Sequence, residues 1–184
     1  MTILIVGLLI FIGIHALPWS VEGRAGLQQK LSANGYKVAF SIISAIGLGL
    51  IIWGKSVAPF EPLWQPITAL KPLTICLVWM AFVLLPAAHM KTNIKRITPH
   101  PMSWAVICWG VAHLLVNGDL ASVLLFGSLT LYAMGAIISA NTRGAKTSDA
   151  ALPLKSDLIV VAAGTTVFIV IAGAHAHLFG YPVF

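Results

Sequence analysis

Six uninterrupted apolar runs constrain the fold of this chain more than any other feature of its sequence. Each run is roughly 15–22 residues long and free of charged side chains, close to the ~20 residues that a membrane-spanning helix needs. Because a helix satisfies its own backbone hydrogen bonds in lipid, the pattern predicts an all-α polytopic bundle of six transmembrane helices. The runs are Ile3–Leu17, Val38–Trp53, Pro72–Ala88, Met102–Val116, Leu120–Ala140 and Leu158–Phe179.

The composition supports a membrane location for the whole chain. Hydrophobic residues make up 59% and charged residues 9% of the 184 residues, whereas a soluble domain has about a quarter charged residues. The longest connections, near 18–37 and 54–71, are too short for a soluble domain, so residues 1–184 are predicted to form one integral-membrane domain. The first run lacks a basic flank and a cleavage site, so we expect a retained helix. The absence of a transit peptide favours a multi-pass protein of a bacterial inner membrane.

The basic residues are distributed unevenly over the connections. Nine of the 11 lysines and arginines flank the first, third and fifth connections, and only Lys55 and Lys71 flank the second. By the positive-inside rule, we expect both termini outside, in the periplasm, and the odd-numbered connections in the cytoplasm. The net charge of +6 therefore indicates contact with membrane lipid rather than a nucleic-acid partner. The nine residues are Arg24, Lys30, Lys37, Lys91, Lys95, Arg96, Arg143, Lys146 and Lys155.

Two of the histidines inside apolar runs are candidate functional residues. His113 lies within Met102–Val116, and His15 lies about one turn before Pro18. Ionisable side chains in a membrane span are costly and indicate function. For each histidine two interpretations stay open: a metal or haem ligand, or a hydrogen-bonding residue that holds helices together. Asn117 shares a helix face with His113 and is predicted to orient the imidazole or to line the same pocket.

The triplet Asn117-Gly118-Asp119 separates two of the runs. It predicts a tight hairpin in which Gly118 takes a left-handed conformation and Asp119 caps the next helix. A role for Asp119 in proton relay stays open as the alternative. No phosphate-binding glycine loop, Cys-x-x-Cys or His-Glu-x-x-His motif is present, so histidine ligation is the chemistry that remains.

The other four histidines and two glycines have simpler interpretations. His89 and His100 are predicted to lie at the cytoplasmic interface. His175 and His177 are predicted to reach the outer interface from the last helix. Gly164 and Gly173 in the same helix indicate close helix–helix packing.

Several motifs closely resemble the NnrU family. They are Phe11-x-Gly13-x-His15, Pro99-His100-Pro101-Met102-x-Trp104 and Ala112-His113-Leu114-Leu115-x-Asn117-Gly118-Asp119. The resemblance covers roughly residues 1–143. It implies a bacterial polytopic membrane protein associated with nitrite and nitric oxide reduction.

The plant zeta-carotene isomerase shares this domain and is a haem b enzyme with histidine ligands. The resemblance therefore implies that haem b binds this chain, with His15 and His113 as ligands and His89 in reserve. Asn117 and Arg24 are expected beside the cofactor, Arg24 as a cation for the haem propionates. At about 1.5 Å per residue, His15 and His113 differ in depth by roughly 6–8 Å. Gly110 stands where the isomerase has a cysteine, and Pro99 precedes His100 where the family usually has arginine.

We expect a redox carrier, or an accessory of a respiratory nitrogen-oxide reductase such as nitric oxide reductase, in denitrification. Whether the protein is an enzyme stays open. The alternatives are a haem-dependent carotenoid cis–trans isomerase-like enzyme, an isoprenylcysteine-methyltransferase-like membrane enzyme and a purely structural membrane subunit.

Overall fold

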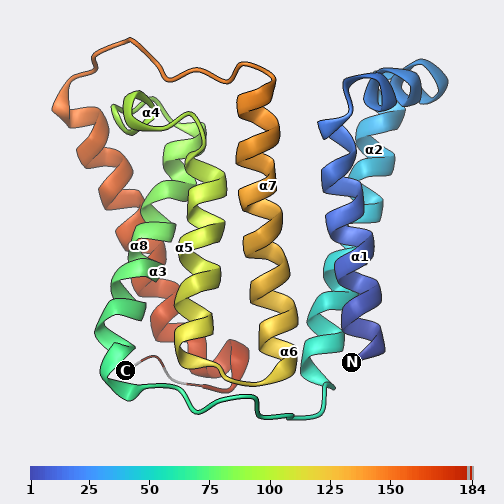
Figure 1. Ribbon diagram of the computed structural model, residues 1–184. Helices are drawn as coiled ribbons and strands as arrows, with labels where there is room; N and C mark the ends of the chain where they lie inside the picture. The colour runs from blue at the N-terminus through green and yellow to red at the C-terminus, as the bar shows by residue number, and fades with distance from the viewer. Residues whose placement is uncertain (182, 184) are drawn as a thin grey trace.

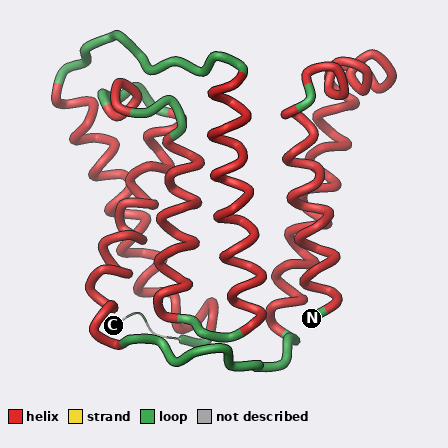
Figure 2. Tube along the Cα trace, viewed as in Figure 1, coloured by secondary structure: helices red, strands yellow, loops and turns green. Residues whose placement is uncertain are grey.

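The chain folds into long helices that run up and down beside one another (Figures 1 and 2). The computed structural model describes residues 1–181 and residue 183, which form no β-strand beyond an isolated bridge between Pro62 and Asp119. The main helices are α1 (Thr2–Ala16), α2 (Val21–Ser56), α3 (Lys71–His89), α5 (Pro101–Val116), α7 (Ser128–Thr142) and α8 (Leu154–Phe179). Shorter elements are η1 (Leu17–Trp19), η2 (Thr68–Leu70), α4 (Ile94–Ile97), α6 (Leu120–Ser122) and the π-helical stretch η3 (Val123–Gly127).

The predicted all-α membrane class is confirmed at the level of helices and their lengths. Five segments are long and apolar enough to cross a membrane. The apolar helix α5 has only 16 residues and is shorter than those five. Large apolar side chains such as Leu9, Leu131 and Ile169 are exposed on the outer faces of their helices, as expected where lipid takes the place of water. The five segments are Thr2–Trp19, Val21–Ser56, Thr68–His89, Leu120–Thr142 and Leu154–Phe179.

The first connection differs from the sequence prediction. Residues 21–37, expected within a connection, are helical and belong to α2. Ser20 caps this helix by accepting a hydrogen bond from the Gly23 amide at 3.0 Å. The helix bends sharply at Ser32 (φ 64°, ψ 164°), whose hydroxyl accepts from the Gly35 amide at 3.2 Å. Helix-forming residues and two serine caps thus make two helices of this stretch, which hydropathy alone does not reveal.

Small residues allow the helices to approach closely. A Cβ atom on Gly54 would lie 2.4 Å from the backbone nitrogen of Leu4, so α2 contacts α1 backbone to backbone. Gly164 of α8 approaches α3 in the same way, since a Cβ atom there would lie only 2.5 Å from the Phe82 carbonyl oxygen. The prediction of close packing is therefore confirmed for Gly164. It is wrong for Gly173, where a Cβ atom would have no neighbour within 4 Å among the described residues.

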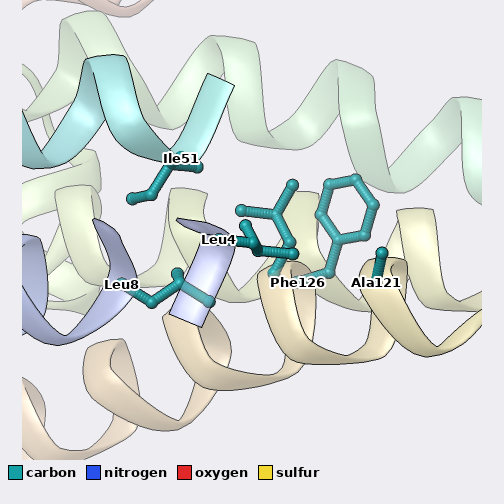
Figure 3. Packing of buried hydrophobic residues seen from close by; sticks show 6 residues of the cluster. Leu4, Leu8, Ile51, Ala121 and Phe126 are labelled. Atoms are coloured by element: carbon teal, nitrogen blue, oxygen red, sulfur yellow. The ribbon is translucent and has the colours of Figure 1, made fainter. Parts of the chain in front are cut away.

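The α1–α2 hairpin stands beside the other helices in Figure 1 and joins them through a buried apolar cluster. Figure 3 shows this cluster, in which side chains from α1 and α2 meet those from α6 and η3. Helix α1 also contacts α7 directly. Burial of this cluster fixes the level of α1 relative to α6 and η3, and with it the place of His15. The members are Leu4, Leu8, Ile51, Ala121, Leu125 and Phe126.

The start of α1 and the end of α8 lie at the same end of the bundle, the lower end in Figure 1. The opposite, upper end holds the α1–α2, α3–α5 and α7–α8 connections. The nine lysines and arginines that flank the odd-numbered connections therefore gather at the upper end, which we call the basic end. The α2–α3 connection and the α5–α6 turn lie at the other end.

Candidate functional site

His113 lies within an aromatic environment close to the C-terminal end of α5. Its Nδ1 donates a hydrogen bond to the Trp109 carbonyl oxygen at 2.8 Å. The imidazole stacks on the Phe126 ring of η3 at 4.5 Å between centroids and 22° between planes. Trp109 packs edge-on against the same Phe126 ring at 4.8 Å. Because Nδ1 is occupied by the main chain, Nε2 is the nitrogen left to bind a metal or a proton donor.

His15 has the same local arrangement in α1. Its Nδ1 donates to the Phe11 carbonyl oxygen at 2.7 Å, again four residues earlier. The ring lies 4.1 Å from Phe11, 5.0 Å from Phe40 of α2 and 6.2 Å from Tyr132 of α7, between centroids. The Tyr132 hydroxyl donates to the His15 carbonyl oxygen at 3.2 Å. His15 is therefore held where α1, α2 and α7 meet, with Nε2 free of hydrogen bonds to described residues.

The structure does not bring His15 and His113 together on one level. His113 stacks on Phe126, whereas His15 lies beside Tyr132, six residues further along the same helical segment. Six residues correspond to about 9 Å of helix rise. On α1, His15 lies seven residues beyond Leu8, which shares the buried cluster with Phe126, and this corresponds to about 10 Å. The two estimates agree, and they place His15 nearer the basic end.

This geometry tests whether the two histidines suit haem. Each imidazole suits an axial ligand, because a hydrogen bond at Nδ1 orients the ring and leaves Nε2 available. Metal–imidazole bonds are about 2 Å long, so two axial ligands of one iron lie close together on opposite sides of it. The rise of about 9 Å separates the main-chain positions of the two histidines, not their Nε2 atoms. Each histidine by itself therefore has the local arrangement of a haem ligand.

The turn between α5 and α6 is built by Asn117, Gly118 and Asp119. The Asn117 side-chain amide donates to the His113 carbonyl oxygen at 2.8 Å, so it caps α5 and does not contact the imidazole through this bond. The Asp119 carboxylate accepts from the Ser122 amide at 3.0 Å and caps α6, which confirms the predicted cap. Gly118 was expected to be left-handed, and that expectation is wrong, because the described glycines with positive φ are Gly144 and Gly180.

The reason for glycine at position 118 is a close backbone approach. The Leu63 and Trp64 amides donate to the Gly118 carbonyl oxygen at 2.7 and 3.2 Å, which pins the α2–α3 connection onto the turn. A Cβ atom at Gly118 would lie 2.0 Å from the Trp64 carbonyl oxygen. Glycine is required at position 118 because the Trp64 backbone lies too close for a side chain, not because Gly118 has a positive φ angle.

Lys55 completes a polar cluster at this turn. Its ammonium group donates to Asp119 Oδ1 at 3.0 Å and to the Ser122 hydroxyl at 2.8 Å. The Ser122 hydroxyl in turn donates to Asp119 Oδ2 at 2.5 Å. Desolvation acts to raise the pKa of the Asp119 carboxyl, but the hydrogen bonds from Ser122 and Lys55 together outweigh it and lower the pKa. The carboxylate is thus satisfied as an anion, an arrangement that serves structure rather than proton relay.

Arg24 and His89 lie at the basic end. Arg24 is exposed in the first part of α2. His89 is the exposed last residue of α3 and lines a cavity of about 550 Å³ together with His100 and residues of the α7–α8 connection. His100 donates from Nε2 to Asn141 Oδ1 at 2.6 Å. The interface position predicted for His89 and His100 agrees with their place at this end of the bundle.

A comparison with known protein families covers nearly the whole chain. The NnrU protein family model matches residues 3–183. This chain belongs to the NnrU family. No curated protein and no solved structure gives a significant match. The match extends past residue 143, where the motif resemblance ends, and so includes α8.

In this NnrU protein the contacts of Gly110 explain why that position carries no side chain. A Cβ atom there would lie 2.0 Å from the Thr130 hydroxyl oxygen and 3.0 Å from the Phe126 carbonyl oxygen. Helices α5 and α7 approach each other at this point. A cysteine ligand at position 110 therefore has no counterpart in this packing.

His175 of α8 lies at the same end of the bundle as His113. The His175 Nδ1 donates to the Tyr181 carbonyl oxygen at 2.6 Å. Both histidines lie in the C-terminal part of their helices, α5 and α8, which end on the same side of the bundle. The sequence predicts this shared position, but hydropathy does not say which helices are adjacent.

Proposed function

We propose that this NnrU protein is a six-helix protein of a bacterial inner membrane that binds haem b through a histidine imidazole. We further propose that it serves respiratory nitrogen-oxide metabolism, as a redox carrier or as an accessory of a nitrogen-oxide reductase. Family membership and the motif resemblance around His15 and His113 support the metabolic part. The hydrogen-bond arrangement of the two histidines supports the haem part.

One observation carries the haem proposal. In both His15 and His113, Nδ1 donates to a main-chain carbonyl oxygen at 2.7–2.8 Å and Nε2 is left unbonded by the described residues. Histidines that bind metals nearly always hold their second ring nitrogen in this way. Haem held there would supply one-electron redox chemistry at its iron. The protein's own part is to orient the imidazole and to exclude water with Phe126, Trp109 or Tyr132.

His113 and His15 are separate candidate ligands in this proposal, because about 9 Å of helix rise separates their levels. A haem with a single protein ligand keeps one axial position open. Such an iron would bind carbon monoxide, whereas an iron with two histidine ligands binds it poorly or slowly. Carbon monoxide binding therefore measures how many histidines bind the iron.

The charge distribution supports the orientation. With the basic end in the cytoplasm, nine of the 11 lysines and arginines lie there, as the positive-inside rule requires. The 16 residues of α5 span about 24 Å. The helix packs along α3 and α7, so we propose it as the sixth span in a hydrocarbon core of about 30 Å.

An absorption spectrum of the purified protein tests the haem proposal. We expect the wild-type protein to show a Soret band after expression with adequate haem supply. One of the two variants His113→Ala and His15→Ala should lose this band, and the other should keep it. His177→Ala, which removes an exposed histidine, is the matched control. A wild-type protein without a Soret band would contradict haem binding.

The metabolic proposal has its own test. In a denitrifying host deleted for this protein, we expect slower consumption of nitrite or nitric oxide, restored by the wild type. The variant that loses the Soret band should fail to restore it. Restoration by that variant would exclude a haem-dependent role in this pathway.

A further inference from the structure

The charged residues that line the cavity at the basic end are all basic. Its lining includes Lys95 of α4, Lys146 of the α7–α8 connection and the imidazoles of His89 and His100, and contains no acidic residue. The hydroxyl groups of Ser103 and Ser148 also line it. Among the described residues the one ion pair joins Lys55 to Asp119 at the opposite end of the bundle. The positive charge of the cavity is therefore not neutralised by a carboxylate within ion-pair distance.

The first turn of α5 adds to this positive field. The helix begins at Pro101 and no side chain caps its N-terminus, and Pro101, Met102 and Ser103 line the cavity. Unpaired amide groups at the start of a helix favour an anion. The 16 residues of α5 are enough to give it a developed helix dipole.

The walls of the cavity are held in place by hydrogen bonds. The Ser148 amide donates to the Lys95 carbonyl oxygen at 2.9 Å, which joins the α7–α8 connection to α4. Asn93 exchanges two hydrogen bonds with the Leu152 backbone, each 2.9 Å long. Asn93 and the buried Thr92 also donate to the Asp157 carboxylate. The carboxylate of Asp157 is thus engaged away from Lys95 and Lys146.

An apolar groove of about 480 Å³ adjoins this cavity. The two share Pro99 and His100 as a common wall. The groove is lined by Met80, Leu84, Ile97, Trp104 and Ile137. Ile97 is 83% exposed and Trp104 is 43% exposed. A cationic cavity beside an apolar groove matches a molecule with an anionic head and a hydrocarbon chain.

We propose that this pair of pockets binds one anionic phospholipid, with its phosphate in the basic cavity and an acyl chain in the groove. Basic pockets between helices at a membrane interface are known to bind such headgroups. The His100 Nε2 donates to Asn141, which orients the ring on the shared wall. Neither His15 nor His113 lines the site, so this proposal is independent of haem binding.

Quenching of tryptophan fluorescence tests the position of the acyl chain. The full-length protein in detergent is titrated with phosphatidylglycerol that carries brominated chains, and with brominated phosphatidylcholine. We expect stronger quenching by phosphatidylglycerol, and loss of the difference in Trp104→Phe. Trp64→Phe, which removes an equally exposed tryptophan (43%) at the other end, should keep it. Equal quenching by both lipids, or persistence of the difference in Trp104→Phe, would overturn the proposal.

Lysine variants test the headgroup. Each lysine near an anionic lipid contributes about fivefold in affinity, so Lys95→Gln with Lys146→Gln should weaken phosphatidylglycerol binding by about 25-fold. Lys91→Gln with Lys155→Gln removes the same charge from exposed positions at the same end and should change it less than twofold. If both pairs of substitutions weakened phosphatidylglycerol binding equally, the lipid would be attracted by the surface charge in general, and the proposed site would be wrong. If the first pair fails to fold, the Trp104 and Trp64 comparison still decides.

Competition separates a lipid from a free anion. Inorganic phosphate and glycerophosphoglycerol, the headgroup without its chains, are added to the lipid-loaded protein. We expect neither to displace the brominated lipid at millimolar concentration, because both lack the chain that occupies the groove. Displacement by either at the concentration at which the lipid binds would assign the cavity to a soluble phosphate and overturn the lipid assignment.

Discussion

The ammonium group of Lys55 lies 3.0 Å from the carboxylate oxygen Oδ1 of Asp119, 64 residues further along the chain. This ion pair joins the end of α2 to the turn before α6. The Asp119 side chain is 8% exposed and that of Lys55 is 33% exposed. The pair therefore ties the α1–α2 hairpin to the other helices at the end opposite the basic cavity.

Asp119→Asn should destabilise the protein by about 1–3 kcal/mol, because a hydrogen bond between charged groups becomes a weaker neutral one. Thermal unfolding in detergent, followed by circular dichroism, measures the change. Glu61→Gln removes an exposed carboxylate from the neighbouring connection and should stay within about 0.5 kcal/mol. Equal losses in the two variants would mean that the Lys55–Asp119 pair contributes nothing specific.

The same carboxylate predicts a pH dependence. Its pKa is lowered in the folded protein, so its stabilising contribution is complete above the unfolded pKa of about 4. The contribution is lost as the pH falls below that value through the lower folded pKa. The stability difference between wild type and Asp119→Asn should be constant from pH 7 to 5 and shrink below about pH 4. A difference that grows on acidification would contradict this sign.

Gly118→Ala should destabilise the turn by about 1–3 kcal/mol or more, since the added methyl group would overlap the Trp64 carbonyl oxygen at 2.0 Å. Gly49→Ala is the control, because nothing lies within 4 Å of its Cβ position in α2 and alanine favours helices by up to ~1 kcal/mol. Unfolding midpoints should therefore move in opposite directions. A neutral Gly118→Ala would indicate that the connection at 63–64 is not held against the turn.

Two glycines of α8 allow a comparison within one helix. Gly164→Ala should lower the unfolding midpoint, because its methyl group would lie 2.5 Å from the Phe82 carbonyl oxygen of α3. Gly173→Ala meets no atom within 4 Å and should leave the midpoint unchanged or raise it slightly. Similar effects at the two positions would contradict the tight contact between α3 and α8.

Cysteine labelling tests the proposed orientation. Cys76 and Cys108 are free, so both are first replaced by alanine. Asp149→Cys and Phe60→Cys then place exposed thiols in the α7–α8 and α2–α3 connections. A membrane-impermeant maleimide should label position 60 in intact spheroplasts and position 149 only in inverted vesicles. The reverse pattern would place the basic end outside.

Several features of the fold were predictable from local sequence alone. The run Ile3–Leu17 corresponds closely to α1 (Thr2–Ala16), because lipid exposure imposes both length and hydropathy on a span. Asp119 was predictable as a cap, since a cap needs only its own side chain and amides up to three residues away. The helical stretch from Val21 was missed because its composition is mixed and its caps, Ser20 and Ser32, carry no hydropathy signal.

The candidate site was less predictable. His15 and His113 were identified as unusual residues in apolar runs, but the rise of about 9 Å between their levels, counted along η3 and α7, depends on how α1 and α5 are docked. The reason for glycine at positions 110 and 118 likewise appears only with Thr130 and Trp64 in place.

The sequence by itself determined that this is an α-helical membrane protein with one strongly basic end, because hydropathy, charge and helix caps act over a turn or a span. Only the tertiary structure places His113 against Phe126, and only it forms the basic cavity from α3, α4, α5 and the α7–α8 connection. The physical reason is that close packing between helices depends on side-chain shape at contacts far apart in the chain. Those contacts cannot be predicted from hydropathy, charge or helix caps.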